Sequence, residues 1–341
     1  MKRQSQGDAR APGASYIVLS LVVLLASLCL SLSEGELKIS LLDMPRILRE
    51  GGTLEHSVLT QIRIPRTLLA LAVGCSLSLC GVILQGVYRN PLVEPYTLGI
   101  SGGASLGVTL AIVAGWSALG AWVLPAFGFV GALMTILLVY ALSMLRRAPS
   151  ISRMLLCGVM VSFISSSLVL FLMSVTSVEN LPGIVYWTMG SLSRSSDAVL
   201  YLLPVVSLLV LGCAMLFALP LNALRMGEPL ARHLGVETHG MIRILFVLTS
   251  LLTGCCIAVS GVIGFVGLII PHVTRYFVGQ DHRILLPASY INGGIFLVLS
   301  DILARTVIYP NELPIGVITG IVGGISFLII IGTRRRSREI W

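Results

Sequence analysis

Ten apolar stretches divide this chain, and little sequence is left between them. A helix that crosses the hydrocarbon core of a bilayer, which is ~30 Å thick, needs about 20 mostly apolar residues. Charged residues make up only 11% of the chain, whereas a soluble domain keeps roughly 25% to hold its surface in water. Most of the surface must therefore face lipid. The predicted spans are residues 16–33, 65–86, 95–115, 118–142, 152–173, 198–219, 241–259, 262–278, 285–304 and 314–332.

The fold class that follows is an all-α integral membrane protein of about ten transmembrane helices. Spans of about 20 residues with short connections leave no room for a soluble domain, so residues 1–341 are expected to form one transmembrane domain. The first span follows Lys2, Arg3 and Arg10, as the core of a signal peptide would. Its apolar run is longer than a usual signal core and no small-residue cleavage site follows, so we predict a transmembrane helix.

The basic residues cluster in the breaks between apolar stretches, which is how a membrane protein marks its cytoplasmic side. With the N-terminus inside, the cytoplasmic segments carry 16 of the 23 Lys and Arg residues and the outside carries 7. This asymmetry predicts a multi-pass protein with both termini in the cytoplasm and an even number of spans. It also explains the net charge of +8 by orientation, so no nucleic-acid partner is expected.

Glycines spaced by four residues mark two of the predicted spans. They are Gly99, Gly103 and Gly107 in the third span, and Gly316, Gly320 and Gly324 in the tenth. In lipid, small residues let helix backbones approach closely, which holds the helices together. Two interpretations stay open: these faces pack helices within the chain, or they line a pathway or a dimer seam.

Glycine, cysteine and proline residues recur at an offset of 180 along the chain. Gly74-Cys75 recurs as Gly254-Cys255, Gly81 as Gly261, Pro91 as Pro271 and Gly99 as Gly279. The offset pairs the second span with the seventh, and these run in opposite directions in the predicted topology. We therefore predict an inverted repeat of helices 2–5 against helices 7–10, an arrangement that transporters use to alternate access.

The chain lacks the residues that the common energy-coupling chemistries need. Its only lysines are Lys2 and Lys38, and neither stands in a phosphate-binding loop of the GxxxxGK[ST] type. ATP hydrolysis would therefore need a separate subunit, and no cofactor or enzymatic activity is expected in this chain. No His, Asp or Glu cluster lies within a span to ligate a bare metal ion. Asp301 has Arg305 one helical turn later, which predicts an ion pair.

Residues 220–240, after the sixth span, form a polar segment with a helical pattern. Pro229 suits a first helical turn, Leu230 and Leu234 lie on one helix face, and Gly235 suits a position just past a helix end. A short amphipathic helix of this kind needs a surface to dock on. That surface can belong to a partner subunit or to the chain itself, and the segment alone does not decide.

Several runs of residues resemble the FecCD-type permeases from about Arg63 to the C-terminus. These runs are Arg63-Ile-Pro-Arg66, Gln85 followed by Asn90-Pro-Leu-Val-Glu-Pro95, Leu98-Gly-Ile-Ser-Gly-Gly-Ala104, Trp187-Thr-Met-Gly-Ser191, Gly264-Phe-Val-Gly-Leu-Ile-Ile-Pro-His-Val-Thr-Arg275, Asp301-Ile-Leu-Ala-Arg305 and Glu312-Leu-Pro-Ile-Gly316. The resemblance implies the type II permease fold of ABC importers, the ATP-binding-cassette transporters. In these, a homodimer or heterodimer of permeases works with two cytoplasmic ATPase subunits that bind ATP and Mg²⁺, and with an extracytoplasmic substrate-binding protein.

The resemblance also implies site residues. The loop after helix six couples to the ATPase, which here maps onto Gly227, Glu228, Ala231, Arg232, Leu234 and Gly235. Outward-facing arginines dock the binding protein, and the matching positions are Arg63, Arg66 and Arg305. Gating is expected near the fifth span and the external stretch from Leu181 to Ser196.

By the same resemblance, the chain is a permease subunit in a bacterial cytoplasmic (inner) membrane that imports an iron chelate, such as a siderophore or haem, or cobalamin. A cargo wrapped in its own ligands needs no metal ligands in the pathway. The alternatives are an ABC permease for bare zinc or manganese and an ATP-independent secondary transporter, which would need a coupling-ion site within the membrane.

Overall fold

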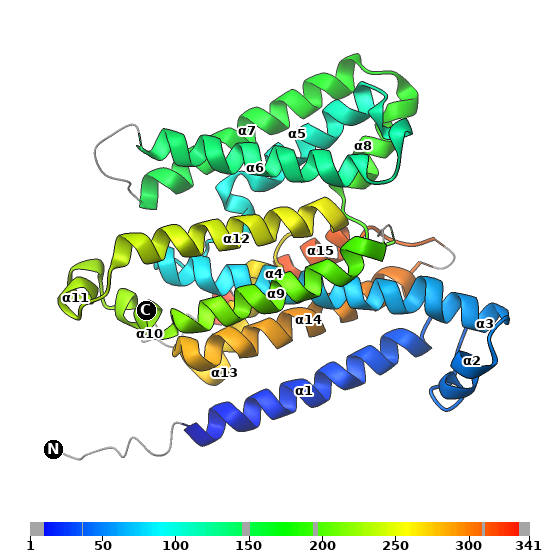
Figure 1. The fold of residues 1–341 in the computed structure, drawn as a ribbon, viewed down its shortest axis with the longest axis horizontal. Helices are drawn as coiled ribbons and strands as arrows, with labels where there is room; N and C mark the ends of the chain where they lie inside the picture. The colour runs from blue at the N-terminus through cyan, green and yellow to red at the C-terminus, as the bar shows by residue number, and fades with distance from the viewer. Residues whose placement is uncertain (1–9, 36, 145–150, 194–196, 309–310, 334–341) are drawn as a thin grey trace.

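The computed structural model describes residues 10–35, 37–144, 151–193, 197–308 and 311–333, and these residues form helices and the turns between them (Figure 1). The helices in the predicted spans are α1 (Arg10–Ser33), α4 (Ile64–Tyr88), α5 (Ile100–Val113), α6 (Val123–Met144), α7 (Ile151–Val175), α9 (Asp197–Leu216), α12 (Thr238–Ser260), α13 (Val266–Val278), α14 (His282–Thr306) and α15 (Ile315–Thr333). The shorter elements are α2 (Met44–Glu50), α3 (Leu54–Ser57), η1 (Val58–Arg63), η2 (Pro95–Leu98), η3 (Trp116–Leu119), η4 (Val178–Asn180), α8 (Leu181–Thr188), α10 (Ala218–Arg225) and α11 (Glu228–His233).

Each predicted span coincides with a helix, so the prediction of an all-α multi-pass membrane protein is confirmed. Six helices of the described chain are long and apolar enough to cross a bilayer, and α9 with α10 makes a seventh if that pair, bent by 57°, is one span. The other three predicted spans are shorter apolar helices, α5, α13 and most of α15. The chain thus fills its ten predicted spans with helices of unequal length.

Two spans begin later than the apolar pattern predicts. The third was expected from residue 95, but α5 begins at Ile100 because Gly99 has φ 86° and ψ −4°, a left-handed conformation that ends the preceding turn. The eighth was expected from residue 262, but α13 begins at Val266 because Phe265 has φ 70° and ψ −21°. A non-glycine residue in this region is uncommon and costs energy. Both short helices therefore start from the same kind of backbone break.

Helix α4 is the centre of the bundle. It packs against α14, α12, α13 and α9, and almost every residue from Arg66 to Tyr88 is buried. A helix that is apolar all round is expected in the interior of a helix bundle. Helix α1 lies along one side of the bundle, mainly against α14.

The two halves of the chain repeat one pattern. Helices α4–α7 and α12–α15 each have their shortest helix second, α5 with 14 residues and α13 with 13. Helix α4 packs on α14 and α12 packs on α6, which are equivalent contacts when the halves are exchanged. Because α4 follows α3 and α12 follows α11, which lie at opposite ends of the molecule, the two helices run in opposite directions (Figure 1). The predicted inverted repeat is confirmed.

The residue register of that repeat does not extend beyond its first helix. Pro91 lies in the turn after α4, whereas Pro271 lies inside α13. The reason is that α12 stops at Ser260, where Gly261 has φ 66°, while α4 continues to Tyr88. The pairs Pro91 with Pro271 and Gly99 with Gly279 are therefore matches in sequence but not in structural position.

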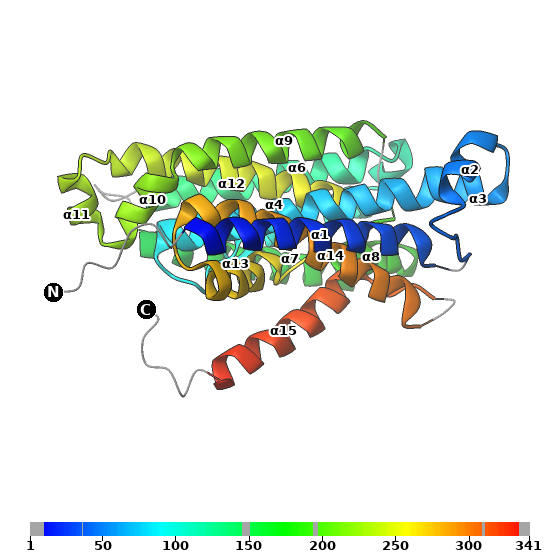
Figure 2. The same ribbon diagram turned by 90° about the horizontal axis from the view of Figure 1, so that it is seen from below.

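The molecule has two distinct ends, which we call the α11 end and the α3 end after the short helices that lie there (Figure 1). Helix α1 begins and α15 finishes toward the α11 end, as an even number of spans requires; residues 1–9 and 334–341 lie outside the described chain. Helix α15 diverges from the bundle along most of its length (Figure 2) and contacts α14 and α13.

Candidate functional site

The segment after the sixth span forms two short helices rather than one. Helix α9 ends at Leu216, the chain turns by 57° into α10, and α11 follows after a break at Gly227, whose φ is 114°. Pro229 lies in the first turn of α11, and Gly235 follows the helix with φ 83°, its N–H donating to the carbonyl of Arg232. Both predictions about the ends of this helix are confirmed.

Helix α11 has one face on the chain and one face free. Ala231 is fully buried against the protein, whereas Leu230 and Leu234 are 45% and 60% exposed. Glu228 accepts a hydrogen bond of 2.7 Å from Arg232, and Arg232 also donates to the hydroxyl of Thr238 at the start of α12. These bonds hold α11 against α12 and leave an exposed apolar face at the α11 end.

At the opposite end, the three arginines expected to dock a binding protein are engaged within the chain. Arg66 on α4 pairs with Asp301 on α14 at 2.8 Å and with Glu312 at 2.7 Å. The predicted pair of Arg305 with Asp301 is confirmed at 3.1 Å. The side chains of Arg66 and Arg305 are only 8% exposed, while Glu312 is 50% exposed. Asp301 therefore lies buried between two guanidinium groups.

Arg63 and Arg305 also form hydrogen bonds with the C-terminal end of α1. The guanidinium group of Arg63 donates to the carbonyl oxygens of Leu32 at 2.7 Å and Ser33 at 3.1 Å, and that of Arg305 donates to the Ser31 hydroxyl at 3.0 Å. The last carbonyls of a helix have no partner within the helix, and cations near them are favourable. This geometry fits anchoring residues, and docking at these positions stays a prediction.

A cavity of about 840 Å³ opens near these arginines. Its walls come from the turn between α5 and α6, the stretch after α8, the end of α12 and the start of α15. Among the lining residues are Arg66, Trp187, Ser191, Gly261, Glu312 and Ile315. The stretch after α8 is tied to both neighbours, because Ser191 N donates to Ser260 O at 2.8 Å and Gly316 N donates to Met189 O at 3.1 Å.

The structure separates the two glycine faces that the sequence left undecided. On α5, a Cβ at Gly103 would overlap Thr135 and the backbone of Gly131 on α6, so this face packs helices within the chain. On α15, a Cβ at Gly320 or Gly324 would meet no atom within 4 Å. Gly320 and Gly324 therefore lie on a face of α15 that no described residue of this chain covers, whereas a Cβ at Gly316 would overlap the backbone oxygen of Met189.

The family model for the FecCD transport family matches residues 23–333. This chain belongs to the FecCD transport family. Among curated FecCD relatives, the haemin transport system permease protein HmuU of Yersinia pestis is 38% identical over 283 residues, which cover 82% of this chain and 84% of HmuU. The vitamin B12 import system permease protein BtuC of Salmonella paratyphi A is 39% identical over 314 residues, or 91% and 92% of the two chains.

Two further matches extend over nearly the whole FecCD chain. The uncharacterized ABC transporter permease protein YvrB of Bacillus subtilis is 38% identical over 343 residues, 96% of each chain. A solved ABC transporter structure, assigned to the metal-chelate type and in an inward-facing conformation, is 32% identical with a TM-score of 0.84, over 94% of this chain and 99% of that one. The fold of this FecCD chain is therefore that of an ABC importer permease.

Sequence reasoning missed several parts of these sites. Glu312 completes the ion pairs of Arg66 across 246 residues, and no spacing in the sequence links the two. Trp187 and Ser191 fall in the family pattern and in the stretch expected to contribute to gating, but neither was singled out, although both line the large cavity. Among the residues that the structure describes, no three His, Cys, Asp or Glu side chains gather into a possible metal site.

Proposed function

We propose that this protein is the membrane-spanning permease subunit of an ATP-driven importer for a metal chelate or cobalamin in a bacterial cytoplasmic membrane. The observation that carries the proposal is the match to haem and vitamin B12 permeases at 38–39% identity over more than four fifths of the chain. The cargo class follows from those relatives, and an iron chelate is our first choice within it.

The proposal places the α11 end in the cytoplasm. The breaks that carry Arg89, Arg225 and Gln280 meet at one cavity near this end, as the excess of basic residues on the cytoplasmic side requires. The exposed Leu230 and Leu234 would then dock on an ATPase subunit, which supplies the ATP and Mg²⁺ chemistry. Exposed apolar surface outside the spans supports such a contact, because soluble surfaces of this kind usually bind partners.

A second permease would complete the pathway. The uncovered glycine face of α15 and its divergence from the bundle (Figure 2) support a contact with another copy or a related permease along this helix. The large cavity beside Trp187 would then be the entrance at the side where a substrate-binding protein delivers cargo. Substrate movement would follow from the differential affinity of ATP for two conformations of the complex.

Reconstitution tests this function. The chain is co-purified with the ATPase and binding protein encoded beside it, placed in proteoliposomes and offered a ferric siderophore, haemin or cyanocobalamin. We expect one loaded binding protein to stimulate ATP hydrolysis and drive ATP-dependent uptake. Uptake by the chain without any ATPase would support a secondary transporter instead. Uptake of bare Zn²⁺ or Mn²⁺ would support an ABC permease for bare metal ions.

Docking at the arginines has its own test. Because Glu312 is half-exposed and already pairs with Arg66, a carboxylate of a binding protein could exchange with it. Replacing both Arg66 and Arg305 by Glu should weaken binding-protein affinity and uptake. A matched Arg46→Glu variant, exposed at the same end, should leave both unchanged. If a folded Arg66→Lys variant is less stable but binds the binding protein with unchanged affinity, Arg66 has an anchoring role only.

A further inference from the structure

The backbone between α12 and α13 is irregular and begins at the wall of the large cavity. Helix α12 stops at Ser260, and both Ser260 and Gly261 line this cavity. Helix α13 begins only after Phe265. We call residues 261–265 the α12–α13 break. Irregular backbone at membrane depth is tolerated where it is buried in protein or lines a cavity, and the break meets both conditions, since Ile263 is fully buried.

The break supports the stretch after α8. Ser191 N donates to Ser260 O at 2.8 Å, directly before the break. A Cβ at Gly190 would lie 2.7 Å from the backbone oxygen of Val262, and one at Gly316 would lie 2.9 Å from the same oxygen. The stretch after α8 belongs to the region where gating is expected. The position of this region therefore depends on the conformation of the break.

Two side chains from the other repeat hold the break. Ile263 N donates to the hydroxyl of Tyr96 at 3.3 Å, and Phe265 N donates to a carboxylate oxygen of Glu94 at 3.2 Å. Tyr96 is only 8% exposed, and a buried backbone N–H needs a partner. Glu94 and Tyr96 lie in the turn after α4, which is the first helix of its repeat as α12 is of the other. The two repeats are thus joined where each first helix has ended.

The bond to Glu94 lies at a strained residue. Phe265 has φ 70° and ψ −21°, a conformation that is costly for any residue except glycine and that is often found in switch regions. Without the carboxylate, Phe265 would gain by returning to a relaxed conformation. The chain would then leave α12 in a different direction, and the stretch after α8 would lose its support.

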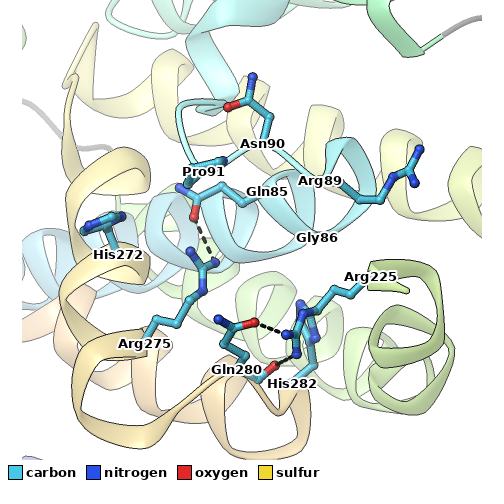
Figure 3. Close-up of a pocket in the computed structure, with 10 residues that line it drawn as sticks. All are labelled: Gln85, Gly86, Arg89, Asn90, Pro91, Arg225, His272, Arg275, Gln280 and His282. Carbon is cyan, nitrogen blue, oxygen red and sulfur yellow. Dashed lines mark hydrogen bonds between the residues drawn. The ribbon is translucent and has the colours of Figure 1, made fainter. Parts of the chain in front are cut away.

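Helix α13 is held to α4 by separate bonds. Gln85 on α4 donates to the backbone oxygen of Gly267 at 3.1 Å and accepts from Arg275 at 3.1 Å (Figure 3). One side chain thus fixes α13 at two positions. A rotation at Phe265 would therefore move the α12–α13 break and leave α13 in place, which is the behaviour of a hinge.

We propose that Glu94 and Tyr96 are positioning residues for transport. They hold the α12–α13 break, and through it the stretch after α8, in the conformation that shapes the large cavity. Phe265 is the hinge that rotates when the pathway changes conformation. The role in transport rests on the proposed function, because an importer needs two conformations of the complex. The positioning itself is a property of the chain alone.

The test uses the full-length chain in nanodiscs and needs neither ATPase nor cargo. Ser260→Cys places a thiol at a cavity-wall position that is 2% exposed. Its rate of alkylation by a membrane-impermeant maleimide is measured above the background of the native cysteines. Adding Tyr96→Phe or Glu94→Leu should raise this rate about three- to tenfold, the factor expected for the loss of one hydrogen bond. Glu94→Gln keeps an acceptor oxygen and should raise it less.

Controls separate positioning from general loosening. The Tyr88 hydroxyl is buried on α4 without a hydrogen-bond partner in the described chain, so Tyr88→Phe should leave the rate unchanged. Phe265→Gly removes the strain, because glycine adopts positive φ readily. In that background Glu94→Leu should raise the rate less. Tyr96→Phe removes only a hydroxyl, so it tests the proposal even if Glu94→Leu does not fold.

Two results would overturn the proposal. One is an unchanged rate in Tyr96→Phe and in folded Glu94→Leu, and the other is an equal effect of Glu94→Leu with and without Phe265→Gly. In the reconstituted complex, Tyr96→Phe should hydrolyse more ATP for each cargo molecule imported than the wild type. If the wild-type complex imports no cargo, the proposed function fails while the labelling result stands.

Discussion

The side-chain nitrogen of Gln85 on α4 donates a hydrogen bond of 3.1 Å to the backbone oxygen of Gly267 on α13. This oxygen is available because Pro271, four residues later, has no N–H to donate to it. The bond crosses between the two repeats, where α4 and α13 pack so closely that a Cβ at Gly81 would overlap Gly267. A glutamine buried in the bundle thus satisfies the oxygen that a proline leaves free.

A double-mutant cycle can measure this relationship. Gln85→Leu should cost about 1–3 kcal/mol because it leaves the buried Gly267 oxygen unsatisfied. In a Pro271→Ala background the cost should fall, because the N–H of the introduced alanine can donate to Gly267 within the helix. Gln85→Leu also removes the hydrogen bond that Arg275 donates to Gln85. This loss is the same in both backgrounds, so it cancels in the cycle. Unfolding in detergent gives the free energy of unfolding of the wild type, the two single variants and the double variant. If the two single losses of stability add up to that of the double variant, the two residues are not coupled.

Asp301 should be among the carboxylates whose loss is most damaging. It is completely buried between Arg66 and Arg305, so Asp301→Asn removes the counter-charge of Arg305 and one of the two carboxylates that pair with Arg66. Breaking a buried ion pair costs about 3–5 kcal/mol. Glu50→Gln is the control, since the Arg46–Glu50 pair is more than half exposed and should contribute less than ~1 kcal/mol. Equal melting temperatures for the two variants would contradict this difference.

Glu94 predicts a pH dependence of stability. It lies in the turn between α4 and α5, and burial raises its pKa despite a hydrogen bond of 3.2 Å from Phe265 N. The folded chain therefore holds this proton more tightly than the unfolded chain, whose glutamate has a pKa of about 4.3. Stability should fall as pH rises from that value through the folded pKa. Between these two pKa values, the difference between the melting temperature of Glu94→Gln and that of the wild type should grow as pH rises. If the melting temperatures of the two proteins change with pH in parallel, Glu94 does not cause the effect.

Two glycine substitutions separate packing from exposure. Gly103→Ala adds a Cβ that overlaps Thr135 and Gly131 on α6, and overpacking of this kind costs about 1–3 kcal/mol. Gly324→Ala meets no atom of the described chain and should stabilise α15 by about 0.5–1 kcal/mol. Thermal unfolding of the isolated chain compares them. If both variants lose stability equally, the α15 face is covered in the monomer.

The free face of α11 predicts a defect in assembly without a defect in folding. Leu234 is 60% exposed, so Leu234→Asp should change the stability of the chain by no more than about 0.5 kcal/mol. It should reduce co-purification with the ATPase subunit. Leu42→Asp, at a leucine 91% exposed just before α2, is the control and should co-purify normally. Normal assembly of Leu234→Asp would remove this residue from the interface.

The amino-acid sequence by itself determined where the chain crosses the membrane and which breaks share a side. Both follow from local properties, because a run of apolar residues prefers lipid wherever it occurs and basic residues mark one side. The short helix after the sixth span followed in the same way, from Pro229 and Gly235 at its ends. The inverted repeat was visible only along α4 and α12.

Tertiary structure alone decided the rest, because it depends on contacts between residues far apart in the chain. Arg66 pairs with Asp301, which is 235 positions away in the chain. Because of this pair, arginines that were expected to face outward are buried beside an acidic residue. The left-handed backbone at Phe265 is stabilised by Glu94 from the other repeat, so the late start of α13 could not be read from its own apolar run. The two glycine faces look alike in sequence, and only the position of α6 beside α5 distinguishes them.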